Sequence, residues 1–253
     1  MDTQEKENEM KKVTLAKQIV FAGLTLWFAI MGCGLLTTSV NEVRTESQSV
    51  SVDSATSASV QIEFAAGELK VQSGSSNLMD ASFRYNVDDW QPQVNYSESG
   101  AQGELIVSQP GSDQLPSGGG LINEWKLLLT NDIPLDLLIR AGAGNNELNL
   151  GGLDLAALKI ESGAGNTKVY LDGNWDHDVL ASIKGGVGNL TVNLPAEMGV
   201  LVIMDTALVN VSANGLIVAE NGYVNQAYGS APYTFTLNLE VGVGSVTLVV
   251  PGS

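Results

Sequence analysis

Short stretches of alternating apolar and polar residues recur from residue 60 onward, most of them introduced by glycine. Apolar residues at every second position are typical of β-strands with one buried face. The stretches are AAGELKV at 65–71, AQGELIV at 101–107, GAGNNELNL at 142–150, GAGNTKVYL at 163–171, GVGNLTVNL at 186–194, GVGSVTLVV at 242–250 and a glycine-free copy, ALVNVS, at 207–212. No helical period of ten or more residues follows residue 33, so the pattern predicts an all-β chain.

The spacing of the glycine stretches predicts the coils of a β-solenoid. Gly144 and Gly165 are 21 residues apart, and Gly165 and Gly188 are 23 apart. The 56-residue step to Gly244 leaves room for two or three turns with an insertion near 218–232. One coil cannot bury its apolar face, whereas stacked coils bury a continuous core. We expect the glycines at corners that need positive φ, with coils over 121–253, and keep a β-sandwich as the alternative fold.

The region before the coils has a different character. Residues 60–120 form a predicted N-terminal β region, preceded by a Ser- and Thr-rich linker at 34–59 whose residues 47–52 alternate like a strand. Residues 79–87 and 93–97 predict a hairpin around Asp88 and Asp89. Its aromatic residues are expected to pack on the first coils, with a sugar- or peptide-binding platform as the alternative. They include Tyr85, Trp90 and Tyr96.

The N-terminus predicts export. Lysines at 11, 12 and 17 precede an apolar segment, IVFAGLTLWFAIMG at 19–32, in the order of a secretory signal. Met10 is an alternative start. The segment IMGC at 30–33 resembles a bacterial lipoprotein lipobox, which implies that Cys33 is lipidated and residues 1–32 are removed. The alternative is an uncleaved anchor helix extending to Leu36, although the apolar segment is shorter than the ~20 residues that a spanning helix prefers.

Composition excludes several classes of function. The chain has 12 Lys and Arg against 28 Asp and Glu, a net charge of −16, so it is a poor nucleic-acid binder. One cysteine cannot form an internal disulfide, and one histidine leaves no His-rich zinc site. Residues 1–33 are neutral overall, so the exported part carries the whole negative net charge. Its surface therefore repels anionic lipid headgroups. Attachment to a membrane then depends on the anchor at Cys33.

One loop carries candidate ligands. The segment DGNWDHD at 172–178 places oxygen-bearing side chains at alternate positions, which is the chemistry that calcium prefers. The weak calcium candidates are Asp172, Asn174, Asp176 and Asp178. His177 and Ile183 stand where an EF-hand has Gly and Glu, so a solvated acidic turn is the alternative. We expect no catalytic residues. The only dense acids of the coils share this one loop, a nucleophile–His site would rest wholly on His177, and no glycine corner completes G-x-G-x-x-G.

Four motifs between about 45 and 250 carry a family resemblance: FAAGELKVQSG at 64–74, FRYNVDDWQPQVNY at 83–96, GELIVSQP at 103–110 and the GAGN corners. With them the chain resembles the bacterial toast-rack family of exported proteins. The resemblance implies a right-handed, β-helix-like stack, often on a lipoprotein anchor, without an established enzymatic role.

We therefore expect a non-catalytic protein on the outer face of the cell membrane that presents a rigid solenoid for adhesion, scaffolding or envelope sensing. The expected partners are the membrane through Cys33 and an envelope protein or glycan, with no cofactor other than the calcium candidate. The alternatives are a carbohydrate-active β-helix enzyme and a calcium-dependent binding module.

Overall fold

The computed structural model describes residues 41–110 and 119–252, so the predicted signal at 1–33 and its Cys33 lie outside the described residues. The described part is all-β: 13 strands form one mainly parallel sheet, beside a single 3-10 turn, η1 (Asp88–Trp90). The strands are β1 (Arg44–Val50), β2 (Ser57–Ser75), β3 (Met79–Tyr85), β4 (Gln93–Ser99), β5 (Gln102–Ser108), β6 (Asn123–Thr130), β7 (Leu135–Asn149), β8 (Leu155–Tyr170), β9 (Val179–Asn193), β10 (Gly199–Asn214), β11 (Ile217–Ala219), β12 (Gly222–Val224) and β13 (Thr234–Val249). A mainly parallel sheet differs from the antiparallel layers of the alternative β-sandwich.

The long strands each serve two parts of the sheet. The beginning of β2 pairs with β5 and its end pairs with β6, while β7 runs beside both parts. The change occurs at Gly67, and β7, β8, β9 and β13 carry a glycine in the same register. We call the part before this corner glycine the first arm and the part after it the second arm. The predicted corner glycines with positive φ are therefore confirmed on β2, β7, β8, β9 and β13, although they lie inside long strands rather than between short ones. Gly103 lies in β5 instead and is not a corner.

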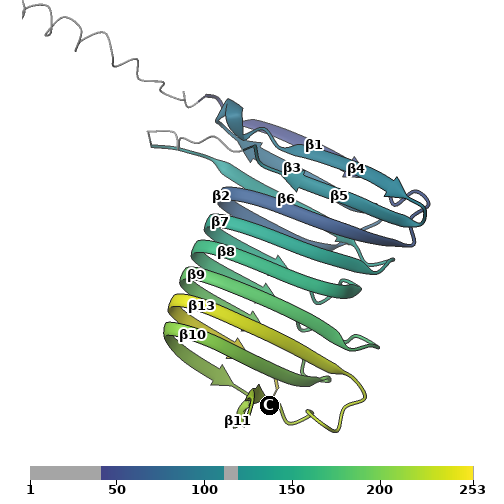
Figure 1. Cartoon of the computed structure of the whole chain (residues 1–253). Coiled ribbons are helices and arrows are strands. Elements are labelled where there is room, and N and C mark those ends of the chain that lie inside the picture. Colours follow the sequence, from purple (N-terminus) through teal and green to yellow (C-terminus); the bar gives the residue numbers. More distant parts are fainter. Residues whose placement is uncertain (1–40, 111–118, 253) are drawn as a thin grey trace, which may run out of the picture. The chain divides into compact units, whose positions relative to one another are not determined.

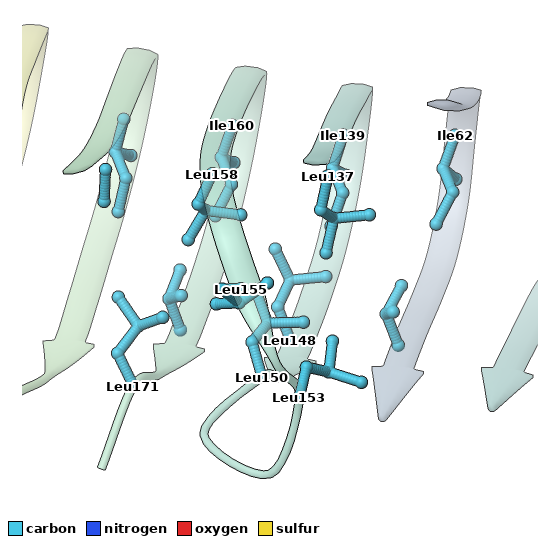
Figure 2. Close-up of a cluster of buried hydrophobic side chains, with 14 of the residues drawn as sticks. Ile62, Leu137, Ile139, Leu148, Leu150, Leu153, Leu155, Leu158, Ile160 and Leu171 are labelled. Carbon is cyan, nitrogen blue, oxygen red and sulfur yellow. The ribbon is translucent and has the colours of Figure 1, made fainter. Parts of the chain in front are cut away.

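The core fills the space between the arms and is closed by the loops that follow the second arms. Figure 2 shows Leu137 and Ile139 from the first arm of β7 and Leu148 from its second arm. It also shows Leu150 and Leu153 from the following loop and Leu155 at the start of β8. All six are buried. The loop leucines continue the backbone ladder, since the amide of Leu150 donates to the carbonyl of Tyr170 at 2.9 Å. Each coil thus needs its neighbour to bury this face.

The order of coils in space differs from their order in sequence. β13 lies between β9 and β10, in parallel register with both (Figure 1). The 56-residue step from Gly188 to Gly244 therefore holds one coil, β10, and a connection with β11 and β12, instead of the two or three turns predicted. Backbone pairing is nearly independent of side chains, so the repeat pattern does not reveal which coils are neighbours.

The predicted hairpin is wrong in its pairing. β3 and β4 lie close to the expected positions, but β3 pairs with β1 and β6, while β4 pairs with β5. The hairpin is β4–β5, and β3 extends the second-arm side of the sheet. β1 falls within the expected linker, and β2 from the expected N-terminal region stacks directly on β7, so the described residues form one compact unit.

Candidate functional site

The predicted calcium loop connects β8 to β9. Asp178 Oδ1 accepts a hydrogen bond from the backbone amide of Thr234 at 2.7 Å, so this carboxylate ties the loop to β13. Trp175 is buried, donates its indole N–H to the carbonyl of Leu153 at 2.8 Å and packs against Phe235. The loop is therefore held by a buried tryptophan and by one of its four candidate ligands.

The lone histidine of the chain lies in the same loop. His177 Nε2 is 3.0 Å from the carbonyl oxygen of Leu155, and Nδ1 is 3.2 Å from Asp176 Oδ1. The hydrogen bond to Leu155, which has the larger effect, and the hydrogen bond to Asp176 raise the pKa of His177 above its usual 6.5. These contacts favour the protonated imidazole, which suits an ion pair better than a general base.

Metal binding by this loop stays a prediction. Within the part of the chain that the structure describes, no group of three or more His, Cys, Asp or Glu side chains that could hold a metal ion is found. Asp176 is almost fully exposed, with 98% of its side chain accessible. A rise in melting temperature in millimolar calcium, lost in Asp176→Asn, would support the calcium site.

The aromatic residues of the N-terminal region pack rather than project. Tyr85 and Trp90 are buried, and Tyr96 packs partly buried against the core. Burial and the hydrogen bond to Glu46 raise the pKa of Tyr85 to about 12. The packing interpretation is thus confirmed for these three residues, and none of them is an exposed ligand platform.

A row of charged side chains crosses the outward face of the first arms. Consecutive members are register partners on adjacent strands, and their signs alternate until the last pair. The row consists of Glu63, Arg140, Glu161, Lys184, Glu240 and Asp205. Each strand therefore places its charged side chain beside one of opposite sign on the next strand. The exception is the last pair, Glu240 and Asp205, which brings two carboxylates together.

Ion pairs join the members of this row. Arg140 lies 2.9 Å from Glu63 and 3.1 Å from Glu161, while Lys184 pairs with Glu240. Hydrogen bonds from Lys159, which has the larger effect, and from Arg140 hold the pKa of Glu161 below its usual value. These side chains are one-third to about three-fifths exposed, so each pair contributes little to stability. Their main effect is to favour one register of neighbouring coils.

A second row, of amides, follows the corner on the second arms. Asn166 donates to Asn145 at 3.1 Å, and Asn189 donates to Asn166 at 2.9 Å. Ser245 continues the row by donating to Asn189. Stacked side-chain amides of this kind satisfy one another from coil to coil, as the GAGN repeats predict.

Two hollows on the described surface are lined in large part by polar residues, and the larger, of about 510 Å³, lies beside Glu197, Asn225 and Gln226. One depression of about 260 Å³ is lined by Glu68, Lys70, Ser82, Arg84, Glu124, Trp125 and Lys126. Two of these lining residues, Arg84 and Glu124, already form an ion pair at 2.8 Å. The arrangement offers a broad polar surface rather than an enclosed active-site cavity.

Sequence reasoning missed the charged row, although its signal is present. Every member lies four residues before the corner position of its strand, for example Arg140 before Gly144 and Glu161 before Gly165. Aligning the repeats on their corner glycines would have revealed the alternating signs. The break at Asp205 could not be seen, because it depends on β13 lying beside β10.

Comparison with known proteins places the chain in a family. The profile of the N-terminal domain of toast_rack matches residues 39–193. A comparison with curated proteins finds no match.

No helix in residues 41–110 or 119–252 has the length and apolar character needed to cross a bilayer.

Two solved structures of bacterial proteins are similar to the chain. A candidate cell adhesion protein from Clostridium sporogenes is 30% identical, with a TM-score of 0.80, over 83% of this chain and 100% of that one. A candidate adhesin from Bacteroides fragilis is 13% identical over 85% of this chain and 100% of that one; its TM-score of 0.31 is too low to carry an argument. The chain belongs to the toast-rack family.

Proposed function

We propose that the protein is a non-catalytic cell-envelope protein, held on the outer face of the membrane by lipidated Cys33, that presents a rigid right-handed β-solenoid for adhesion. The observation that carries the proposal is the similarity to the Clostridium sporogenes cell adhesion candidate, which extends over that whole solved chain. Scaffolding and envelope sensing are alternative roles for the same surface, because they also need a rigid exported surface.

The surface chemistry supports contact over an area. The first arms expose the charged row, and the second arms expose the amide row, so polar groups repeat at the spacing of adjacent strands. Neighbouring strands lie about 4.8 Å apart. A regular polar surface of this kind matches a repeating partner, such as a glycan or an envelope polymer, better than it matches a small substrate.

The anchor is tested by metabolic labelling with a fatty-acid probe. We expect label on the wild-type chain and none on Cys33→Ser, with the mature protein beginning at Cys33. Absence of label from both would contradict the lipid anchor and favour an uncleaved helix. Adhesion itself is left untouched by that result, so the two parts of the proposal fail separately.

Adhesion is tested with beads that carry the full chain. Their retention on surfaces coated with peptidoglycan, mucin or an acidic polysaccharide would be compared with that of beads carrying an unrelated acidic protein. We expect retention on at least one coating, and competition by free protein. Release of reducing ends from the polysaccharide would instead favour the carbohydrate-active enzyme, while retention only in millimolar calcium would favour the calcium-dependent module.

A further inference from the structure

The outermost long strand has a free edge. On one side β10 pairs with β13 along its whole length, whereas on the other side β12 pairs only with Leu201 and Val202. From Ile203 to Asn214 no other strand of the described residues pairs with this side. At ~3.3 Å per residue the free edge is about 40 Å long, counted along both arms.

This edge lacks the features that usually protect an exposed strand. Its sequence, IMDTALVNVSAN at 203–214, contains one charged residue, Asp205, and neither lysine nor proline. Strand edges are normally blunted by such residues or kept short. β1 and β4, at the opposite end of the strand order, are only seven residues long and carry charged side chains. Pro251 follows β13, which lies inside the sheet, so this proline does not protect the β10 edge.

The core is also open at this end. Leu190, Val246 and Val211 are register partners that face the core on β9, β13 and β10. Leu190 and Val246 are 4% and 0% exposed, whereas Val211 is 37% exposed because no further coil covers it. On the same strand Leu208 is 76% exposed, and Val218 of β11, the last strand in the order, is 79% exposed. Apolar side chains and unpaired backbone groups therefore coincide at one end of the coils.

We propose that the free edge of β10 pairs with the same edge of a second copy of this chain, in antiparallel orientation about a two-fold axis. The free edge is centred between Leu208 and Val209. Val209 is also the corner of β10, since it is the register partner of corner glycine Gly244. A two-fold axis that passes through the corner places the first arm of one copy beside the second arm of the other. Both strands bend at the same point, so they can pair along the whole free edge.

The side-chain faces agree with this register. Pairing about the midpoint places Ile203 opposite Asn214, and both belong to the outward-facing positions of their arms. It places Met204 opposite Ala213, and both are inward-facing residues that pack partly buried on the core. A shift of one residue would oppose inward to outward positions along the whole edge.

Charge favours a second copy at this place. The chain has a net charge of −16, so most surfaces of two copies repel each other. The β10 edge brings a single carboxylate from each copy, and the proposed register sets each Asp205 opposite Ser212 of the second copy rather than opposite another carboxylate. A two-fold interface of this kind is closed, so it ends at a dimer.

The test is the mass of the full chain in detergent, measured by sedimentation with the detergent contribution subtracted. We expect the wild type to be a dimer at micromolar concentration. Leu208→Asp places two carboxylates beside the two-fold axis, and we expect it to weaken dimerisation at least tenfold. The matched control is Leu180→Asp, because Leu180 is 58% exposed on β9, a strand paired on both sides. The control should remain dimeric.

A second measurement fixes the register. In a Cys33→Ser background, Leu208→Cys should be crosslinked between copies by a short bismaleimide, and Leu180→Cys should not. Circular dichroism must show the same strand content for all variants, as their exposure predicts. A monomeric wild type at 100 µM, a Leu208→Asp variant that stays dimeric, or equal crosslinking at both positions would each overturn the proposal.

Discussion

A Cβ atom on Gly188 would lie 1.9 Å from the carbonyl oxygen of Gly165 in the adjacent coil. The same conflict recurs between corner glycines along the stack, with 2.0 Å from Gly165 to Gly144 and 1.8 Å from Gly244 to Gly188. Each of these glycines also has positive φ, 140° in the case of Gly188. The corners thus need glycine for two reasons, backbone conformation and the close approach of the next coil.

Gly188→Ala should therefore be strongly destabilising. We expect the free energy of unfolding to fall by about 3 kcal/mol, because backbone strain and a clash with backbone atoms add together. Urea denaturation of the full chain measures the change. Gly74→Ala is the matched control, since Gly74 has a φ of 114° but no atom within 4 Å of its Cβ position. It should cost only about 1 kcal/mol, and equal losses in both variants would contradict the role of coil contact.

A buried polar pair interrupts the inward row of the second arms. Asn146 Nδ2 donates to Thr167 Oγ1 at 3.0 Å, while leucines occupy the flanking positions, Leu69 and Leu190. Thr167→Val should cost about 1–3 kcal/mol, because it leaves the Asn146 amide without this partner. The double variant Asn146→Leu/Thr167→Val should match or exceed wild-type stability in a denaturant double-mutant cycle. A double variant less stable than Thr167→Val would show that the polar pair is needed.

The charged row should make stability depend on pH in the acid range. Hydrogen bonds from Lys159, which has the larger effect, and from Arg140 lower the pKa of Glu161. The ionised Glu161 carboxylate therefore contributes to the free energy of unfolding above pH 4.5, and this contribution is lost as the pH falls through the lowered pKa. Arg140→Met should lower stability at pH 7 by less than about 1 kcal/mol and flatten the pH slope below 4.5. In 1 M salt the difference from wild type should shrink, and a difference independent of salt would indicate lost packing instead.

His177 should give a slope of opposite sign near neutrality. The Leu155 carbonyl, which has the larger effect, and Asp176 raise the pKa of His177. The protonated imidazole therefore contributes fully to the free energy of unfolding below pH 6.5, and this contribution is lost as the pH rises through the raised pKa. The free energy of unfolding should fall slightly between pH 6 and 8, and His177→Gln should remove that fall. The chain has a single histidine, so the slope can be assigned to it. Stability that increases with pH in this window would contradict the assignment.

Part of the candidate surface could be predicted, and part could not. The amide row follows directly from the repeated GAGN, because equivalent positions of stacked coils become neighbours. The environment of Asp178 could not be predicted, since its partner Thr234 is 56 residues away and belongs to β13. The burial of Trp175 likewise depends on Phe235, which the insertion of β13 brings beside it.

The sequence by itself determined the kind of structure: alternating apolar residues set the strands and their buried faces, and glycines set the corners. These are local requirements, because a strand's period and a positive φ are properties of a few consecutive residues. Only the tertiary structure decided which strands are neighbours. It paired β3 with β1 and β6, placed β13 between β9 and β10, and thereby left the β10 edge open. Strand pairing joins backbone groups that every residue carries, so the choice of neighbour depends on the packing of the whole core.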